Sequence, residues 1–189
     1  MNIADSQLTS ETSSRVRTAD VGLLLVRVVF GGLLAAAGMQ KLFGWFGGQG
    51  LTETGAVFEQ IGYRPGVLFA AIAGLLETGG GLLLLLGLFT PLACSIVIGV
   101  MINAMSATWS GGLFGPNGYQ PALLYATAAM LIACTGAGVL ALDHGRTWQR
   151  DGAPWAAASI GTGIAAAVAV LLLKRSCSAR AGARVTPLS

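Results

Sequence analysis

The chain has 189 residues, of which 54% are hydrophobic and only 10% are charged, and its mean hydropathy is +0.71. An average soluble domain has about 25% charged residues, so this composition excludes a soluble globular protein. The formal net charge is +3, but the basic residues lie in the tails and at helix ends rather than on one face, so no nucleic-acid partner is expected.

Five apolar stretches are long enough to be membrane-spanning helices, because a helix needs roughly 20 mostly apolar residues to cross the hydrocarbon. They cover residues 21–39, 67–89, 92–109, 122–142 and 156–173. Pro91 and Pro121 stand just ahead of the third and fourth stretches, where a missing N–H costs nothing. The sequence therefore predicts an all-α integral membrane protein: a four-transmembrane-helix bundle plus one additional C-terminal transmembrane helix.

The segments around these helices differ in composition. The N-terminal segment is polar and rich in Ser and Thr, which predicts a disordered tail and not a signal peptide. Residues 40–66 predict a loop with a short amphipathic helix at the membrane interface, anchored by Trp45, Phe46 and Tyr63. The expected units are a tail at 1–19, the bundle at 20–143, a charged linker at 144–155, the fifth helix at 156–174 and a basic tail at 175–189.

Two ionisable side chains fall inside the predicted spans, Arg27 in the first and Glu77 in the second. Such residues are costly in a membrane and are candidates for function. At a rise of about 1.5 Å per residue, Arg27 lies roughly 10 Å from one membrane face, whereas Glu77 and Asn103 lie roughly 15 to 18 Å from it. We expect the three to form one intramembrane polar layer. The layer is interpreted as a structural pin, as a charge pair for proton or quinone chemistry or for gating a pocket, or as residues with separate roles at helix ends.

Small and polar residues recur at helical spacing and predict the inward faces of the helices, since small residues let membrane helices approach closely. The stripes are Arg27, Gly31, Ala35 and Gly38, leading to Lys41, on the first helix; Ala70, Gly74, Glu77 and Gly81 on the second; Gly99, Asn103 and Ser106 on the third; and Thr127, Leu131, Cys134 and Gly138 on the fourth.

Thiol and imidazole groups are few. Cys94 and Cys134 fall at similar depths on the third and fourth helices, so they are a possible thiol pair, although a buried cysteine is more often a small hydrophobe. His144 is the single histidine, so no metal site is expected. No catalytic residue is assigned, because the sequence has no phosphate loop, nucleophile elbow or Rossmann fingerprint.

Three groups of motifs resemble the DoxX family of small bacterial integral membrane proteins over residues 20–143. They are LVRVVFGGLLAAAGMQKL in the first helix, LLETGGGLLLLLGLFTPLA across the second and third, and NGYQ followed by TGAGVLALD in the fourth. The resemblance implies a four-helix bundle, to which the fifth helix adds a docking element for a partner. Some relatives are subunits of membrane thiosulfate:quinone oxidoreductases, and others associate with redox-stress enzymes in actinobacteria.

The residues that fit the family pattern are Arg27, Gly38, Lys41, Glu77, Gly87, Gly138 and Asp143. The chain has Thr108 and Trp109 where relatives often carry a histidine, and Gln120 where they often carry a glutamate. Both differences remove titratable groups from one membrane face. Among the polar residues, Lys41, Gln120 and Asp143 are expected at the membrane interface.

The orientation in the membrane is weakly encoded. A cytoplasmic N-terminus leaves Arg15, Arg17, Arg146 and Arg150 inside and places Lys41, Arg64, Lys174, Arg175, Arg180 and Arg184 outside, against the positive-inside rule. The family resemblance and the flank of the first helix favour that orientation, so we expect a multi-pass cell-membrane protein with a cytoplasmic N-terminus.

Three functions are compatible with these features. The leading one is a non-catalytic membrane subunit or anchor of a redox or respiratory assembly, contributing to a quinone or lipid pocket. The second is a quinone-handling oxidoreductase subunit of the thiosulfate:quinone type, and the third is a carrier for a small hydrophobic solute. We expect no covalently bound cofactor, quinone as the candidate ligand, and two kinds of partner: the lipid bilayer, and membrane or redox proteins docked on the fifth helix.

Overall fold

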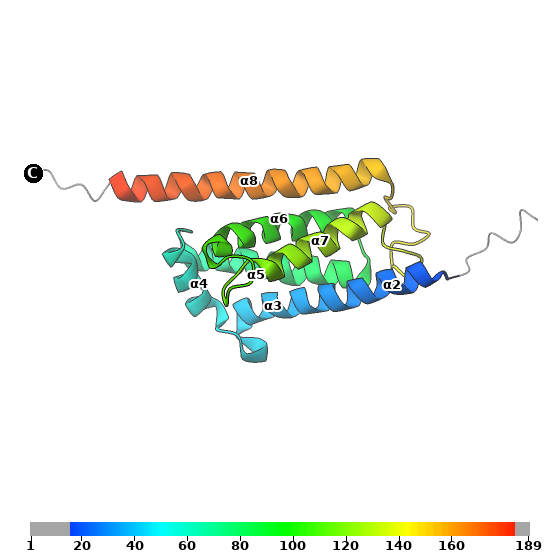
Figure 1. The fold of residues 1–189 in the computed structure, drawn as a ribbon, viewed down its shortest axis with the longest axis horizontal. Coiled ribbons are helices and arrows are strands. Elements are labelled where there is room, and N and C mark those ends of the chain that lie inside the picture. Colours follow the sequence, from blue (N-terminus) through cyan, green and yellow to red (C-terminus); the bar gives the residue numbers. More distant parts are fainter. Residues whose placement is uncertain (1–15, 184–189) are drawn as a thin grey trace, which may run out of the picture.

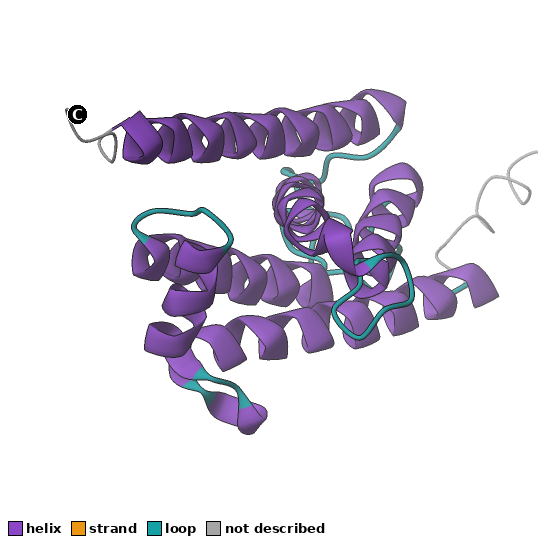
Figure 2. Ribbon diagram, turned by 60° about the vertical axis from the view of Figure 1, so that its left-hand side comes forward, coloured by secondary structure: helices purple, strands orange, loops and turns teal. Residues whose placement is uncertain are grey.

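The computed structural model describes residues 16–183, which form helices joined by loops, and no strand occurs in this range (Figures 1 and 2). The helices are α2 (Thr18–Val26), η1 (Arg27–Gly31), α3 (Gly32–Phe43), α4 (Gly50–Gln60), α5 (Gly66–Leu86), α6 (Thr90–Thr108), α7 (Gln120–Thr135) and α8 (Ala153–Ala183). Short 3₁₀ turns follow α3 at Trp45–Gly47 and α6 at Trp109–Gly111. α2, η1 and α3 are one continuous helix with a π-helical turn at η1.

Within residues 16–183, four helices are long and apolar enough to cross a membrane, which agrees with the predicted all-α membrane protein. They are Thr18–Phe43, Gly66–Leu86, Thr90–Gly111 and Ala153–Ser176. The fourth predicted span was wrong at its C-terminal end, because α7 has only 16 residues and stops at Thr135. Gly136 and Gly138 have φ angles of +79° and +80°, which a right-handed helix does not accommodate, so the apolar sequence after Thr135 forms a loop.

The outer boundaries also differ from the expected ones. α2 begins at Thr18, inside the expected N-terminal tail, and α8 begins at Ala153, inside the expected linker. α8 continues to Ala183, through much of the expected basic tail. The remainder of the two expected tails, residues 1–15 and 184–189, lies outside the described residues.

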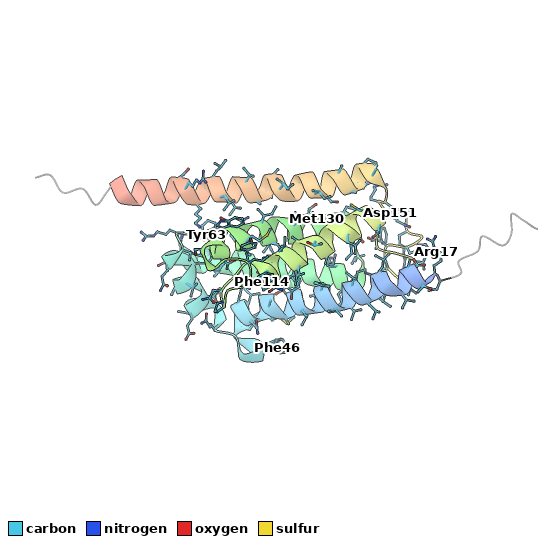
Figure 3. All side chains as sticks on the ribbon, viewed as in Figure 1. Arg17, Phe46, Tyr63, Phe114, Met130 and Asp151 are labelled. Carbon is cyan, nitrogen blue, oxygen red and sulfur yellow. The ribbon has the colours of Figure 1, made fainter. Side chains whose placement is uncertain are left out.

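The predicted interfacial helix is present as α4. Trp45 and Phe46 in the turn before it are 56% and 69% exposed, as expected for anchors in the membrane interface. Tyr63 is different, because it is only 4% exposed and lies inside the protein. In Figure 3, Phe46 and Tyr63 lie at one end of the bundle and Arg17 and Asp151 at the other. These ends are called the α4 end and the α2 end.

The predicted stripes of the first two helices form the contact between α3 and α5. A Cβ on Gly31 would lie 2.7 Å from the carbonyl oxygen of Gly81, and one on Gly38 would lie 2.6 Å from that of Gly74. The two backbones therefore touch, as small residues allow in membrane helices. The pairing also fixes their antiparallel register, so that residues near Arg27 are level with the C-terminal end of α5.

α6 lies at the centre of the remaining helices. Val97, Ile98 and Met101 on α6 pack against Ala126 and Ala129 on α7 in the largest apolar cluster. α8 lies on the outside of α6 (Figures 1 and 2).

The inward faces predicted for the third and fourth helices differ from the observed ones. Gly99 on α6 faces Gly163 of α8 rather than the centre of the bundle. On α7, Thr127, Leu131 and Cys134 are exposed. The Thr127 hydroxyl donates a hydrogen bond to the Leu123 carbonyl oxygen of its own helix, so it needs no partner across a helix contact.

Candidate functional site

The structure does not bring Arg27, Glu77 and Asn103 together. Arg27 binds backbone carbonyls of Leu84 and Leu85, about two turns or 11 Å along α5 from Glu77. Glu77 pairs with Lys41, and Asn103 binds the Gly99 carbonyl oxygen of its own helix. The predicted single polar layer is therefore wrong. The register of α3 against α5 sets Arg27 level with Gly87, and a guanidinium there reaches the free carbonyls of a helix end more easily than the middle of the helix.

Arg27 is 1% exposed and makes three hydrogen bonds, all to backbone carbonyl oxygens. Nε donates to Leu84 at 3.1 Å, Nη2 to Leu85 at 3.1 Å and Nη1 to Ala137 at 2.9 Å. The first two acceptors belong to the last turn of α5, where the helix dipole is negative and carbonyls have few backbone partners; that of Leu84 also accepts from the Gly87 N–H, at 3.1 Å. Arg27 thus closes α5 and ties it to the loop after α7.

Gly87 makes room for this guanidinium. It ends α5 with φ +62°, and a Cβ on it would lie 2.5 Å from Cζ of Arg27. A side chain at this position would meet both a left-handed backbone and a buried cation. Glycine here is required by the turn and by Arg27 together.

Asp143 is 4% exposed, so its carboxylate is enclosed by the protein. Its carboxylate accepts hydrogen bonds from the backbone N–H groups of Phe89 and Thr90, at 2.9 and 2.8 Å, and from the Thr90 hydroxyl at 2.8 Å. The Trp148 indole N–H donates a fourth, at 3.0 Å. An acceptor in this position satisfies the free N–H groups at the start of α6.

Asp20 lies at the α2 end of the bundle, as Arg27 and Asp143 do. It is 4% exposed and accepts hydrogen bonds from the backbone N–H groups of Arg17, at 2.9 Å, and Val139, at 3.3 Å. Asp20, Arg27 and Asp143 together hold the loop after α7 against α2, α5 and α6. These three residues, called the α2-end cluster, contact backbone and capping groups and so have a structural role.

The Lys41–Glu77 ion pair is different, because it joins two side chains inside the membrane. Lys41 Nζ lies 2.6 Å from Glu77 Oε2, and the side chains are 29% and 6% exposed. Glu77 is in the middle of α5, which runs from Gly66 to Leu86. Lys41 was expected at the interface, but its long side chain reaches about one turn inward. A carboxylate and an ammonium in contact can hold or exchange a proton, so this pair is the strongest candidate for chemistry.

An open depression of about 400 Å³ lies between α3 and α4 at the α4 end. Gln40, Lys41 and Thr54 give it a polar lining, and Val57 and Phe58 an apolar one. Lys41 is therefore reachable from the membrane interface, with Glu77 bound behind it. This surface is called the Lys41 depression.

Tyr63 links three segments at the α4 end. Its hydroxyl donates a long hydrogen bond of 3.4 Å to Asn103 Oδ1 on α6, and the Lys174 ammonium of α8 lies 4.6 Å from the ring centroid. Burial raises the pKa of the Tyr63 phenol above its ordinary value, so it is a neutral donor. Asn103 is thus part of an attachment point for α8.

The remaining predicted residues have separate surroundings. Cys94 is fully buried in an apolar cluster with Leu84, Ala93 and Ile132, whereas Cys134 is exposed on α7. Both are free thiols in the structure. Gln120 is exposed at the start of α7.

Three functional or structural partners were not foreseen. Asp20 was not singled out, Tyr63 was expected to be an aromatic anchor at the membrane interface, and Lys41 was not paired with Glu77. A signal for the last was present, because Lys41 follows Gly38 on the stripe that faces Gly74 and Glu77. The other two needed the loop conformations, which apolar periodicity does not encode.

Part of the helical bundle matches a known protein family. Residues 22–110 match the DoxX family, which confirms the resemblance for the first two groups of motifs; the third group lies beyond the matched residues. A stretch of 78 residues is 40% identical to an uncharacterized protein of Haemophilus influenzae and covers 39% of this chain and 58% of that relative. The match therefore spans little more than half of the relative's length. No solved structure matches the chain.

Proposed function

We propose, from the match of residues 22–110 to the DoxX family, that the chain is a non-catalytic membrane subunit that anchors a redox or respiratory assembly. The domain and the apolar helices make it an integral membrane protein. The observation that supports an anchoring role is α8, which lies beyond the DoxX match and leaves one face uncovered. A partner helix is the proposed occupant of that face.

The two sides of α8 have distinct roles in this proposal. Ala156, Ser159, Gly163 and Ala167 are buried against the bundle. Ala157, Gly161 and Ala165 are exposed, and the space beside Gly161 is empty to 4 Å. In a membrane, close packing rather than hydrophobicity holds helices together, so a face of small residues favours a protein neighbour over lipid.

The test is capture of partners by the full-length protein in mild detergent, followed by mass spectrometry. Ala165→Leu enlarges the proposed docking face and is expected to remove specific redox partners. Ala166→Leu is the matched control, because it makes the same change at the adjacent exposed alanine, about 100° around the helix. If both variants retain the partners of the unmodified chain, docking on this face is wrong.

A second candidate function is quinone handling, and the Lys41–Glu77 pair favours it. A bound quinone would supply two-electron redox chemistry. Its carbonyl oxygens need hydrogen-bond donors, which Lys41 and the Gln40 amide provide in the Lys41 depression, while Val57 and Phe58 suit the ring. Glu77 would hold a proton next to the Lys41 ammonium. The donors and the apolar wall fit a quinone headgroup.

Extraction of quinone from the purified protein tests this second function without an activity assay. Lys41→Met is expected to lower the quinone content per chain several-fold. Arg64→Met removes an exposed cation near the same end and is expected to leave the content unchanged. Equal quinone content in both variants and in the unmodified protein, or no quinone in any of them, would rule out quinone handling. Anchoring would then remain as the proposed function.

We also propose that the N-terminus is cytoplasmic. The helices α2–α3, α5, α6, α7 and α8 put the first and last described residues at opposite ends of the bundle (Figure 1). Lys41 is paired with Glu77, so it adds no free positive charge to the α4 end. Reporter fusions at the two termini test the orientation: alkaline phosphatase should be active only at the C-terminus.

A further inference from the structure

A second open surface lies on the opposite side of the bundle from α3, between α6 and α8. It is a groove of about 470 Å³ at the α4 end. Ile102, Met105, Ser106 and Trp109 line it from α6 and the turn that follows, and Leu171 lines it from α8. The lining is mostly apolar, and the Lys41 depression shares none of these residues.

α6 and α8 approach closely at the level of Gly99 and Gly163. A Cβ on Gly99 would lie 3.1 Å from the carbonyl oxygen of Gly163, and one on Gly163 would lie 2.8 Å from that of Ser95. Toward the α4 end the facing positions are Met105 and Leu171, whose side chains keep the backbones apart. The groove lies at these two positions, on the α4 side of the Gly99–Gly163 contact.

The rim of the groove is cationic. The apolar run of α8 ends at Leu173, and Lys174 and Arg175 follow. Because α6 and α8 run in the same direction from the Gly99–Gly163 contact, these two residues are level with Trp109. Arg175 is exposed and lies one helical turn beyond Leu171 on the same side of α8.

The rim also has the aromatic side chain that marks a membrane interface. Trp109 is 65% exposed and stacks on Tyr119, with ring centroids 4.8 Å apart and planes at 11°. Tryptophan at this depth is typical of the headgroup region. The groove thus runs from the headgroup level, where Arg175 and Lys174 lie, into the hydrocarbon.

We propose that this groove binds an anionic phospholipid, with one acyl chain against Met105 and Leu171 and the phosphate paired with Arg175 and Lys174. The apolar walls match the chain, and the two cations match a headgroup with a net negative charge. The Lys174 ammonium already lies over the Tyr63 ring, so it is held near the groove and keeps donors for a phosphate. This site goes beyond the proposed anchoring function and uses different residues.

The test uses full-length protein in nonionic detergent and two synthetic lipids with brominated acyl chains, a phosphatidylglycerol and a phosphatidylcholine. Bromine quenches nearby tryptophan fluorescence. The signal of Trp109 is the difference between the unmodified protein and Trp109→Phe. Phosphatidylglycerol is expected to half-quench this signal at an approximately fivefold lower concentration than phosphatidylcholine. Both lipids have a phosphate, but the choline cation cancels its charge, so only phosphatidylglycerol gains the net attraction of about one arginine.

Three variants separate headgroup recognition from general lipid contact. Arg175→Gln should abolish the preference for phosphatidylglycerol, whereas Arg150→Gln, which removes an exposed cation at the other end, should retain it. Ser106→Phe should fill the groove and reduce quenching by both lipids. The proposal is overturned if neither lipid quenches Trp109, if both do so equally, if Arg175→Gln keeps the preference, or if Ser106→Phe has no effect. None of these readings depends on a protein partner or on quinone.

Discussion

Asp143 accepts two hydrogen bonds from Thr90, one from the backbone N–H and one from the hydroxyl, both at 2.8 Å. The two residues are 53 positions apart in the chain. The contact joins the loop after α7 to the first turn of α6, so this loop is fixed to the N-terminal end of α6. A carboxylate at this position replaces the cap that the helix does not obtain from Phe89, the residue that precedes it.

We expect Asp143→Ala to lower the free energy of unfolding by roughly 2 kcal/mol, because it leaves the N–H groups of Phe89 and Thr90 without an acceptor. Asp143→Asn keeps one oxygen acceptor and should cost about half as much. The measurement is thermal unfolding in detergent. Asp151→Ala, at an exposed carboxylate, should leave the midpoint unchanged; a shift as large as that of Asp143→Ala would contradict the capping role.

Arg27→Met should be more harmful than Asp143→Ala, because it removes three hydrogen bonds to backbone carbonyls inside the protein, and of these acceptors Leu84 keeps a bond from the Gly87 N–H. The expected cost is roughly 3 kcal/mol or more. Arg27→Lys keeps the charge but not the three-way geometry of a guanidinium, so its free energy of unfolding should lie between those of the unmodified protein and Arg27→Met. Arg17→Met removes an arginine whose side chain is 80% exposed and serves as the control. The yield of folded protein and its unfolding midpoint report the result, and equal values for Arg27→Met and Arg17→Met would show that Arg27 does not close α5.

The Lys41–Glu77 pair predicts an asymmetry between its two members. Lys41 is closer to the interface, so without Glu77 its ammonium can turn toward water, whereas Glu77 without Lys41 is a lone carboxylate at 6% side-chain exposure. We therefore expect Lys41→Met to destabilise more than Glu77→Gln. Glu77→Gln should in turn be milder than Glu77→Leu, because glutamine retains a hydrogen bond to Lys41.

A double-variant cycle measures the coupling of this pair. Lys41→Met with Glu77→Leu should recover most of the stability lost in the single variants, since two apolar groups replace a matched ion pair. Additive losses in thermal unfolding would mean that the 2.6 Å contact contributes no coupling energy. If Glu77→Gln and Glu77→Leu are equally harmful, the charge itself matters, and quinone or proton chemistry gains support.

The α3–α5 contact predicts which glycines tolerate a methyl group. Gly38→Ala places a Cβ 2.3 Å from the Thr78 hydroxyl and 2.6 Å from the Gly74 carbonyl, so the helices must separate, at a cost of roughly 1 to 3 kcal/mol. Gly79→Ala has no atom within 4 Å and should be neutral or slightly stabilising in the α5 helix. The measurement is the unfolding midpoint of each variant. Equal midpoints would rule out close packing at Gly38.

The sequence alone predicts the parts of this fold that depend on the length of apolar stretches and on the spacing of small residues. The spans of α5 and α6 and the Gly31–Gly81 contact follow from apolar length and the spacing of small residues. The loop after Thr135 was missed because its residues remain apolar, and only the positive φ angles of Gly136 and Gly138 end the helix. Depth along a helix predicted that Arg27 and Glu77 share a layer, but depth does not say which backbone carbonyls are free to bind a guanidinium.

The last prediction concerns α8, where the sequence offers two faces of small residues and does not say which one packs on the bundle. In the structure Gly163 faces inward, and a Cβ on it would lie 2.8 Å from the Ser95 carbonyl oxygen and 3.0 Å from the Ile98 side chain. Gly161, only two positions away, has no atom within 4 Å.

Gly163→Leu should therefore push α8 away from α6, lower the unfolding midpoint and expose the α6–α8 contact. Gly161→Leu should leave the midpoint unchanged, although it enlarges the face proposed for a partner. The two variants are matched in residue type, helix and depth. Thermal unfolding of each purified protein without partners gives the comparison. If Gly161→Leu is the more harmful, α8 packs on the bundle through its other face, and the partner must then dock on the side of Gly163.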